Sequence, residues 1–132
     1  RTDVIQNPNR KHRGRVLVAY GWKPGCSTDK DAVLLAKSYG ADTIVNMTDV
    51  DYVYEKDPDR YKNAKPIKRM NWKEFKQIVG GKWIPGLNAP FDPVAAKYAE
   101  KLGLKVVILN GKKLLNLDNF LNGKKFVGTA IN

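Results

Sequence analysis

The chain has 132 residues, of which 42% are hydrophobic and 28% are charged, a balance typical of one soluble globular domain with a buried core. No apolar run approaches the ~18 residues that a membrane span requires, and no signal-peptide pattern opens the sequence, so we expect no membrane partner. The single cysteine, Cys26, excludes an internal disulfide and fits a reducing, cytoplasmic environment.

The formal net charge of +11 favours anionic partners such as nucleotides or nucleic acid. The basic residues are spread over separate clusters, at 10–15, 62–69 and 112–125. No helix-turn-helix, RRM or KH signature accompanies them. We therefore interpret them as a solvated surface and expect no nucleic-acid binding. The alternative, a basic RNA-binding module, predicts an affinity that falls steeply with salt.

Residues 1–15 are polar and basic, and the apolar run 16–20 after them predicts a strand. A glycine-containing loop follows. A helix is expected to begin near Thr28, which can cap it, with Asp31 completing an approximate capping box. Gly40 is expected to end this helix.

A second strand is expected at 42–48, followed by an extended or hairpin segment around 51–55 and a turn at 57–59. Residues 59–69 are interpreted as an exposed loop that ends in a short strand. A short helix is predicted at 71–79, with Asn71 as its cap. The apolar residues Trp72, Phe75 and Ile78 recur in it at helical spacing, which indicates that they face the core.

A loop rich in proline and glycine, 82–91, precedes a helix at 92–103 that has an aspartate cap and proline at its first position. A continuously apolar strand at 104–109, a helix at 114–121 and a strand at 125–131 complete the pattern. Strands that alternate with helices, and are apolar throughout, predict an α/β three-layer αβα sandwich with a mainly parallel sheet.

The loop from Trp22 to Asp29 follows the first predicted strand and leads into a helix. Free backbone N–H groups, the helix dipole and the hydroxyls of Ser27 and Thr28 could bind an anion there. Ordinary helix capping explains the hydroxyls equally well, and Lys23 could pair with a phosphate or lie in solvent. No Gly-Lys-Ser/Thr sequence is present, so the loop is not a P-loop.

Thr48 and Asp49 lie at the end of the next predicted strand, with Tyr54 and Asp57 shortly after them. A tyrosine can flank an adenine, and a carboxylate can accept both hydroxyls of a ribose. The alternative is a hairpin whose aspartates accept from turn backbone groups. Because ligands of open α/β sheets bind where strands end, the two polar segments suggest one shared site.

Several of these segments, in the same order, resemble motifs of the uridylate (UMP) kinases of the amino-acid kinase superfamily, with the archaeal-type branch as the closest match. The resemblance runs from about residue 16 to residue 131. It rests on Pro24–Asp29 with Asp31-Ala32, Thr48–Tyr54 with Asp57-Pro58, Asp92–Lys97, and Gly128-Thr129.

This resemblance implies transfer of the γ-phosphoryl group of Mg²⁺-bound ATP to UMP, giving UDP and ADP in pyrimidine nucleotide biosynthesis. It also implies a cytoplasmic homo-oligomer, a hexamer in this family. The UMP site it implies consists of Trp22, Lys23, Pro24, Gly25, Cys26, Ser27 and Thr28. The resemblance also implies that Asp29 is the catalytic carboxylate, which orients phosphate-binding lysines, and that ATP is bound by Thr48, Asp49, Tyr54, Asp57 and Asp92.

The sequence departs from the family in two ways. The family's N-terminal half, with its phosphate-binding glycine loops and lysine, has no counterpart here, so the chain resembles the C-terminal, ATP-binding half. We expect residues 1–15 to continue a missing N-terminal half, residues 16–132 to form the nucleotide-binding domain, and the chain alone to be inactive. In addition, Tyr52 stands where the family has glycine, which adds bulk beside the nucleotide.

Two alternatives keep the same fold. One is another kinase of the superfamily, acting on carbamate, acetylglutamate, aspartate or isopentenyl phosphate. The other is a non-catalytic nucleotide-binding or anion-binding relative.

Overall fold

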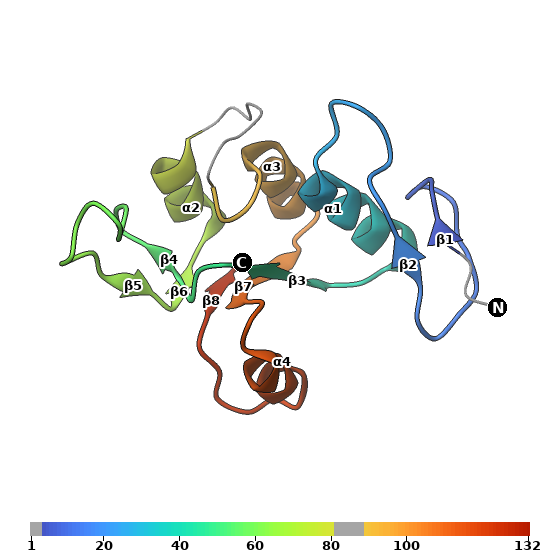
Figure 1. The fold of residues 1–132 in the computed structure, drawn as a ribbon. Coiled ribbons are helices and arrows are strands. Elements are labelled where there is room, and N and C mark those ends of the chain that lie inside the picture. Colours follow the sequence, from blue (N-terminus) through green and yellow to red (C-terminus); the bar gives the residue numbers. More distant parts are fainter. Residues whose placement is uncertain (1–3, 81–88) are drawn as a thin grey trace.

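The computed structural model describes residues 4–80 and 89–132, so most of the predicted loop 82–91 lies outside the described residues. A four-stranded sheet occupies the middle of the molecule (Figure 1). Its strands, in spatial order, are β3 (Thr43–Thr48), β7 (Lys105–Asn110), β8 (Thr129–Ile131) and β6 (Arg69–Met70). β3 pairs with β7 and β6 with β8 in parallel, whereas β7 and β8 are antiparallel. The sheet is therefore mainly parallel, as predicted.

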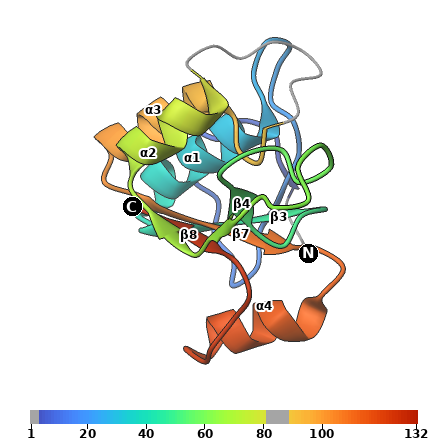
Figure 2. The same cartoon turned by 90° about the vertical axis from the view of Figure 1, so that its left-hand side faces the viewer.

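Helices cover both faces of this sheet. Three of them lie on one face and the fourth lies on the opposite face, an arrangement that Figures 1 and 2 both show. The first three are α1 (Thr28–Tyr39), α2 (Trp72–Val79) and α3 (Pro93–Lys101), and the fourth is α4 (Leu114–Leu121). The predicted three-layer αβα sandwich is confirmed.

Two short sheets flank the central one. β1 (Val4–Ile5) pairs in parallel with β2 (Val18–Ala19), and β4 (Val53–Tyr54) pairs with β5 (Pro66–Ile67) as an antiparallel hairpin. The strand expected at 16–20 is thus shorter than predicted and lies outside the central sheet. Among the described strands it pairs with β1, which the sequence did not predict, and Val16, which precedes β2, is 76% exposed.

Local capping explains where the helices begin. Ser27, not Thr28 as expected, caps α1, because the Ser27 hydroxyl accepts from the backbone N–H of Lys30. Gly40 ends α1 in the left-handed conformation, as predicted. The expected cap of α2 is confirmed as a complete capping box, in which Asn71 and Glu74 each accept from the other's backbone N–H.

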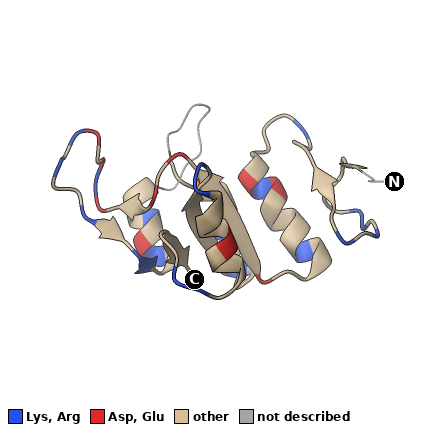
Figure 3. Cartoon of the chain, turned by 60° about the horizontal axis from the view of Figure 1, so that its bottom comes forward, with Lys and Arg blue, Asp and Glu red and all other residues tan. Residues whose placement is uncertain are grey.

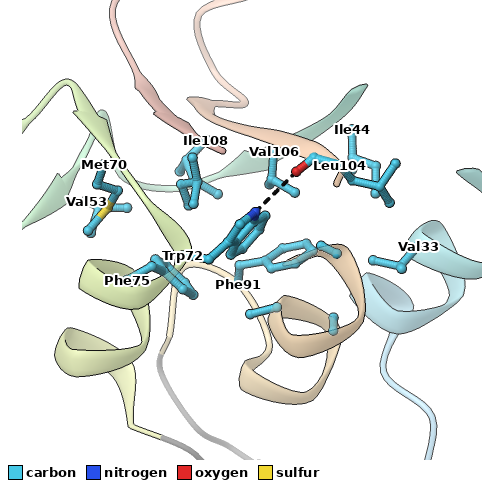
Figure 4. Packing of buried hydrophobic residues seen from close by; sticks show 14 of the residues in the cluster. Val33, Ile44, Val53, Met70, Trp72, Phe75, Phe91, Leu104, Val106 and Ile108 are labelled. Carbon is cyan, nitrogen blue, oxygen red and sulfur yellow. Dashed lines mark hydrogen bonds between the residues drawn. The ribbon is translucent and has the colours of Figure 1, made fainter. Parts of the chain in front are cut away.

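The main core lies between the sheet and the layer of α1, α2 and α3. Trp72 packs between Phe75 and Phe91 in this core (Figure 4). Its indole Nε1 donates to the carbonyl oxygen of Leu104 at 3.2 Å, so the buried ring has no unsatisfied polar atom. Trp72 and Phe75 are core residues, as predicted, but Ile78 is 39% exposed because α2 turns this position away from the sheet.

A smaller core lies under α4. Val107, Leu109 and Ala130 of the sheet pack there against partly buried residues that include Leu117 and Phe120 of α4. The outer face of α4 carries exposed leucines, Leu114, Leu115 and Leu121. None of the helices in the described ranges 4–80 and 89–132 has the length and apolar character needed to cross a membrane.

Lysine and arginine are distributed over α1, α2, α3 and the connecting loops, whereas α4 carries none (Figure 3). In α1 and α2, basic residues alternate with acidic ones, as in Asp29, Lys30 and Asp31. This distribution agrees with a solvated surface more than with one continuous basic stripe.

Among the glycines of the described residues, Gly128, immediately before β8, leaves the least space for a side chain. A Cβ atom at this position would lie 2.5 Å from the carbonyl oxygen of Ile108 and 2.6 Å from the Cδ2 atom of Leu109. The contact with the carbonyl oxygen cannot relax easily, since Ile108 is backbone-paired in strand β7. Glycine is therefore required here by space rather than by backbone conformation.

We expect Gly128→Ala to lower the free energy of unfolding by about 1–3 kcal/mol, the usual cost of overpacking. The matched control is Gly21→Ala, since a Cβ atom at Gly21 meets nothing within 4 Å. Urea unfolding should show a lower midpoint for Gly128→Ala only. Equal midpoints for the two variants would contradict this account of the close approach.

Candidate functional site

A cleft of about 610 Å³ opens where β3 ends. Thr48, Asp49, Tyr54 and Asp57, which the sequence predicted to act together, all line it. The opposite wall comes from the end of α2 and from the segment that leads into α3, with Ile78, Val79, Ala89 and Pro90. The structure thus brings four of the five predicted ATP-binding residues into one cavity.

The chain turns at the end of β3, and the side chain of Thr48 stabilises this turn. The hydroxyl of Thr48 accepts from the backbone N–H of Val50 at 3.2 Å, and the carbonyl oxygen of Thr48 accepts from the N–H of Gly111 at 2.7 Å. This local turn leaves Asp49 exposed at the mouth of the cleft. The strand end is therefore well positioned for contact with a ligand.

A second set of polar residues fixes the segment after β3, and the sequence analysis missed it. Asn110 Nδ2 donates to Asp51 Oδ1 at 2.9 Å, and Lys113 Nζ lies 2.8 Å from Asp51 Oδ2. The hydrogen bond from Lys113 holds the pKa of Asp51 below its ordinary value. The available signal was the polar run 110–113 directly after a predicted strand, which is the same pattern that drew attention to Thr48.

Two tyrosines form the aromatic part of the cleft. The rings of Tyr52 and Tyr54 meet edge to face, with centroids 6.3 Å apart and planes at 88°. No non-glycine residue within the described ranges has a positive φ, so Tyr52 needs no strained backbone to replace a glycine. Its side chain instead adds to the wall of the cleft.

Asp57 has a structural role as well as a place in the cleft. Its Oδ1 atom accepts from the backbone N–H of Asp59 at 2.9 Å, which is the turn contact that the sequence analysis offered as the alternative. Its Oδ2 atom lies 3.4 Å from Arg60 Nε, and the side chain is 48% exposed. The carboxylate therefore still faces solvent in the cleft.

The loop 22–27 is built on a tight turn. The backbone N–H of Cys26 donates to the carbonyl oxygen of Lys23 across Pro24 and Gly25, and Gly25 has a φ of 78°. Proline followed by a positive-φ glycine is the pattern of a type II turn. Lys23 Nζ lies 4.2 Å from the centroid of the Trp22 ring, so the cation covers the indole face.

Asp31 holds this loop onto α1, a role that the sequence analysis did not assign to it. The buried carboxylate accepts from the backbone N–H of Trp22 at 2.9 Å and from Cys26 Sγ at 3.0 Å. Burial, and then the hydrogen bond to Asp31 and its charge, raise the pKa of the Cys26 thiol. The sequence analysis placed Asp31 in an approximate capping box with Thr28, which does not form, because Ser27 is the cap and the Asp31 carboxylate accepts from the loop instead. A contact with Trp22 cannot be predicted from local sequence, since it exists only after the loop folds back.

Asp29, Ser27 and Asp92 form a second polar group, next to the loop. The backbone N–H of Asp92 donates to Asp29 Oδ2 at 2.8 Å, and the Ser27 hydroxyl donates to Asp92 Oδ2. Burial raises the pKa of Asp29 and the nearby Asp92 carboxylate adds to the rise, against the lowering effect of the hydrogen bond from the Asp92 N–H. Asp92 also accepts from the Val94 N–H and so caps α3, as predicted.

Asp92 therefore joins the beginnings of α1 and α3 and is not among the lining residues of the cleft. The cleft and the polar group of Ser27, Asp29 and Asp92 are nevertheless linked through the chain. Asn46 of β3 donates to the carbonyl oxygen of Pro90 at 2.7 Å, and Pro90 lines the cleft two residues before Asp92. The expected shared site thus consists of two neighbouring parts connected by residues 89–92.

These groups are suited to binding and positioning. The cleft provides aromatic rings, carboxylates and hydroxyls, and the loop 22–28 provides a turn and the positive end of a helix. Within the described residues, no cysteine–histidine pair or other activated nucleophile lies in the cleft lining. Chemistry at such a site depends on holding two reactants and neutralising charge.

Comparison with known proteins gives a consistent result. Residues 4–110 match the amino acid kinase family. The chain is 35% identical over 119 residues to a uridylate kinase of Methanospirillum hungatei, covering 89% of this chain and 50% of that protein. It is 36% identical over 119 residues to a uridylate kinase of Methanobrevibacter smithii, covering 89% and 52%. The chain therefore spans about half the length of these relatives.

Solved structures agree with the sequence matches. The crystal structure of uridylate kinase from Archaeoglobus fulgidus superposes with a TM-score of 0.75 at 35% identity, covering 89% of this chain and 52% of that one. A UMP kinase from Bacillus anthracis superposes with a TM-score of 0.72 at 24% identity, covering 88% and 46%, which supports the fold alone.

We expect Asp31→Asn to lower the pKa of the Cys26 thiol, because the substitution removes the carboxylate charge that opposes thiolate formation. Since Cys26 is the only cysteine in the sequence, its rate of alkylation as a function of pH reports this pKa directly. The midpoint should move to lower pH. Asp42→Asn, an exposed carboxylate at the opposite end of β3, should leave it unchanged. An unshifted midpoint in Asp31→Asn would contradict the assigned role.

Proposed function

The chain belongs to the amino acid kinase family, and on this premise we propose that it is the ATP-binding half of a uridylate kinase, which transfers the γ-phosphoryl group of ATP to UMP. The observation that carries the proposal is the convergence of Thr48, Asp49, Tyr54 and Asp57 on one cleft. The relatives named uridylate kinase supply the choice of UMP as acceptor.

In this proposal ATP lies along the cleft from the tyrosines to the end of β3. Tyr54, supported by Tyr52, flanks the adenine, and the exposed Asp57 carboxylate accepts from the ribose hydroxyls. Thr48 and Asp49 then face the phosphates. Lys56 and Arg60, which also line the cleft, provide positive charge near the donor.

The acceptor is assigned to the loop from Trp22 to Thr28. Asp92 engages the Ser27 hydroxyl, whereas Thr28 is exposed in the first turn of α1, where the helix dipole favours an anion. We therefore assign the phosphate of UMP to Thr28. Asp29 is the proposed catalytic carboxylate, and its contact with the Asp92 N–H fixes its orientation.

Phosphoryl transfer places negative charge on oxygens that must be neutralised, and in kinases Mg²⁺ bound to the ATP phosphates supplies this neutralisation. Mg²⁺ is usually bound through one or two carboxylates together with substrate phosphates. Asp49 fits this role, because it is an exposed carboxylate at the phosphate end of the cleft. The chain's own part is to hold ATP and the acceptor in a fixed relative position.

The proposal divides the chain into a segment, 1–15, that continues an N-terminal half and a nucleotide-binding domain, 16–132. Because the relatives are about twice the length that the chain covers, we propose that turnover and acceptor choice require that other half. Assembly into a hexamer and a cytoplasmic location are further parts of this proposal, taken from the family resemblance.

We expect the chain to bind ATP weakly and Asp57→Ala to weaken this binding by roughly tenfold or more, the effect of losing a charge-assisted hydrogen bond. Isothermal titration with ATP in the presence of Mg²⁺ measures both affinities. Turnover of ATP and UMP by the chain alone should be very low.

The matched control is Asp118→Ala, which removes a carboxylate from α4 on the opposite face of the sheet. Asp118→Ala should bind ATP as the unmodified chain does. The proposal fails if the unmodified chain shows no ATP binding, or if Asp57→Ala and Asp118→Ala bind ATP equally well.

A further inference from the structure

We propose that Thr129 is a positioning residue for the cleft, because its hydroxyl holds both strands of the β4–β5 hairpin against the central sheet. Thr129 lies in β8 and is fully buried. Its hydroxyl accepts from the backbone N–H of Val53 at 2.8 Å and donates to the carbonyl oxygen of Ile67 at 2.5 Å. One side chain thus binds β4 and β5 at once.

The hairpin needs such an anchor because its own pairing is short. β4 and β5 are joined at only two register positions, Val53 with Ile67 and Tyr54 with Pro66. Pro66 has no backbone N–H to donate. A two-stranded hairpin of this kind is marginally stable by itself, so its position depends on contacts with the rest of the fold.

The anchor itself is rigid. β8 lies between β7 and β6 in the central sheet, and Thr129 is the register partner of Ile108. Gly128 allows β8 to come this close, since a side chain there would strike the carbonyl oxygen of Ile108. The glycine and the threonine therefore act as a pair, in which Gly128 sets the distance and Thr129 makes the bridge.

The consequence for the cleft follows from what the hairpin carries. Tyr52 and Tyr54 flank the bridged residue Val53, and Asp57 follows in the same segment. These side chains form one wall of the cleft. Loss of the Thr129 hydroxyl leaves the central sheet intact but allows this wall of the cleft to move. The dissociation constant for a nucleotide then rises, while the chain still folds. This last step rests on the proposed function.

Two substitutions test the proposal. Thr129→Val keeps the shape of the side chain and removes both hydrogen bonds, whereas Thr129→Ser keeps the hydroxyl and removes a methyl group. We expect Thr129→Val to weaken ATP binding by roughly tenfold or more, because both hydrogen bonds that hold the hairpin are lost. Thr129→Ser should bind ATP nearly as well as the unmodified chain. Urea unfolding of both variants should be measured alongside ATP binding.

Amide hydrogen exchange separates positioning from a general loss of stability, and it needs no nucleotide. In Thr129→Val the Val53 amide should lose protection by more than tenfold relative to the Val107 amide of β7, because the Val53 N–H loses its acceptor. A purely structural role predicts equal loss at both amides and would overturn the proposal. So would Thr129→Ser behaving like Thr129→Val.

If Thr129→Val does not fold, the unmodified chain still provides the test. The Val53 amide should exchange as slowly as the sheet amides, whereas the Glu55 amide, which is bonded only within the hairpin to Lys65, should exchange faster. Equal exchange at Val53 and Glu55 would overturn the bridge. Absence of ATP binding by the unmodified chain would refute the proposed function alone, since the exchange data judge the bridge independently.

Discussion

The parallel pairing of β3 with β7 determines where chemistry can occur in this fold. The two strands are in register at six positions, from Thr43 with Lys105 to Thr48 with Asn110. Because the two strands run in the same direction, their polar C-terminal ends lie at the same edge of the sheet. Thr48 and Asn110 are therefore neighbours although they lie far apart in the sequence, and together they fix the segment that begins the cleft.

The polar residues that the described part of the fold buries all lie beside the candidate site. They are Asp31, Asp92 and Thr129. Burial of a polar group costs free energy unless hydrogen bonds replace those it made to water, and each of the three makes at least two. Asp31 fastens the loop after β2, Asp92 joins two helix ends, and Thr129 fastens the hairpin.

Local sequence predicted best those elements whose ends are determined locally. The helix expected at 71–79 forms because Asn71 and Glu74 cap each other. The helix expected at 114–121 also has the predicted limits, although no side chain caps its beginning. The strand expected at 16–20 was predicted poorly, because strand length depends on a pairing partner, and the partner β1 is short. Periodicity likewise placed Ile78 in the core, although the cleft needs an apolar wall at that position.

Prediction of the candidate site was likewise limited to features that are set by local sequence. Thr48, Asp49, Tyr54 and Asp57 could be predicted because they are close in sequence and follow one strand. The contacts of Asp31 with Trp22, and of Thr129 with Val53, could not be predicted, because they depend on how separate segments fold together. Sequence patterns and the family resemblance pointed to residues that line the cleft, whereas the groups that hold these residues in place became visible only in three dimensions.

The place of β8 in the chain has a consequence for how the protein is made. β8 follows every other strand in the sequence, yet it lies between β7 and β6 in the sheet. A ribosome therefore releases β3, the hairpin and α2 long before the strand that locks them together has emerged. Contacts between such distant segments form slowly. During translation the nascent chain would carry an unfinished cleft until β8 has emerged.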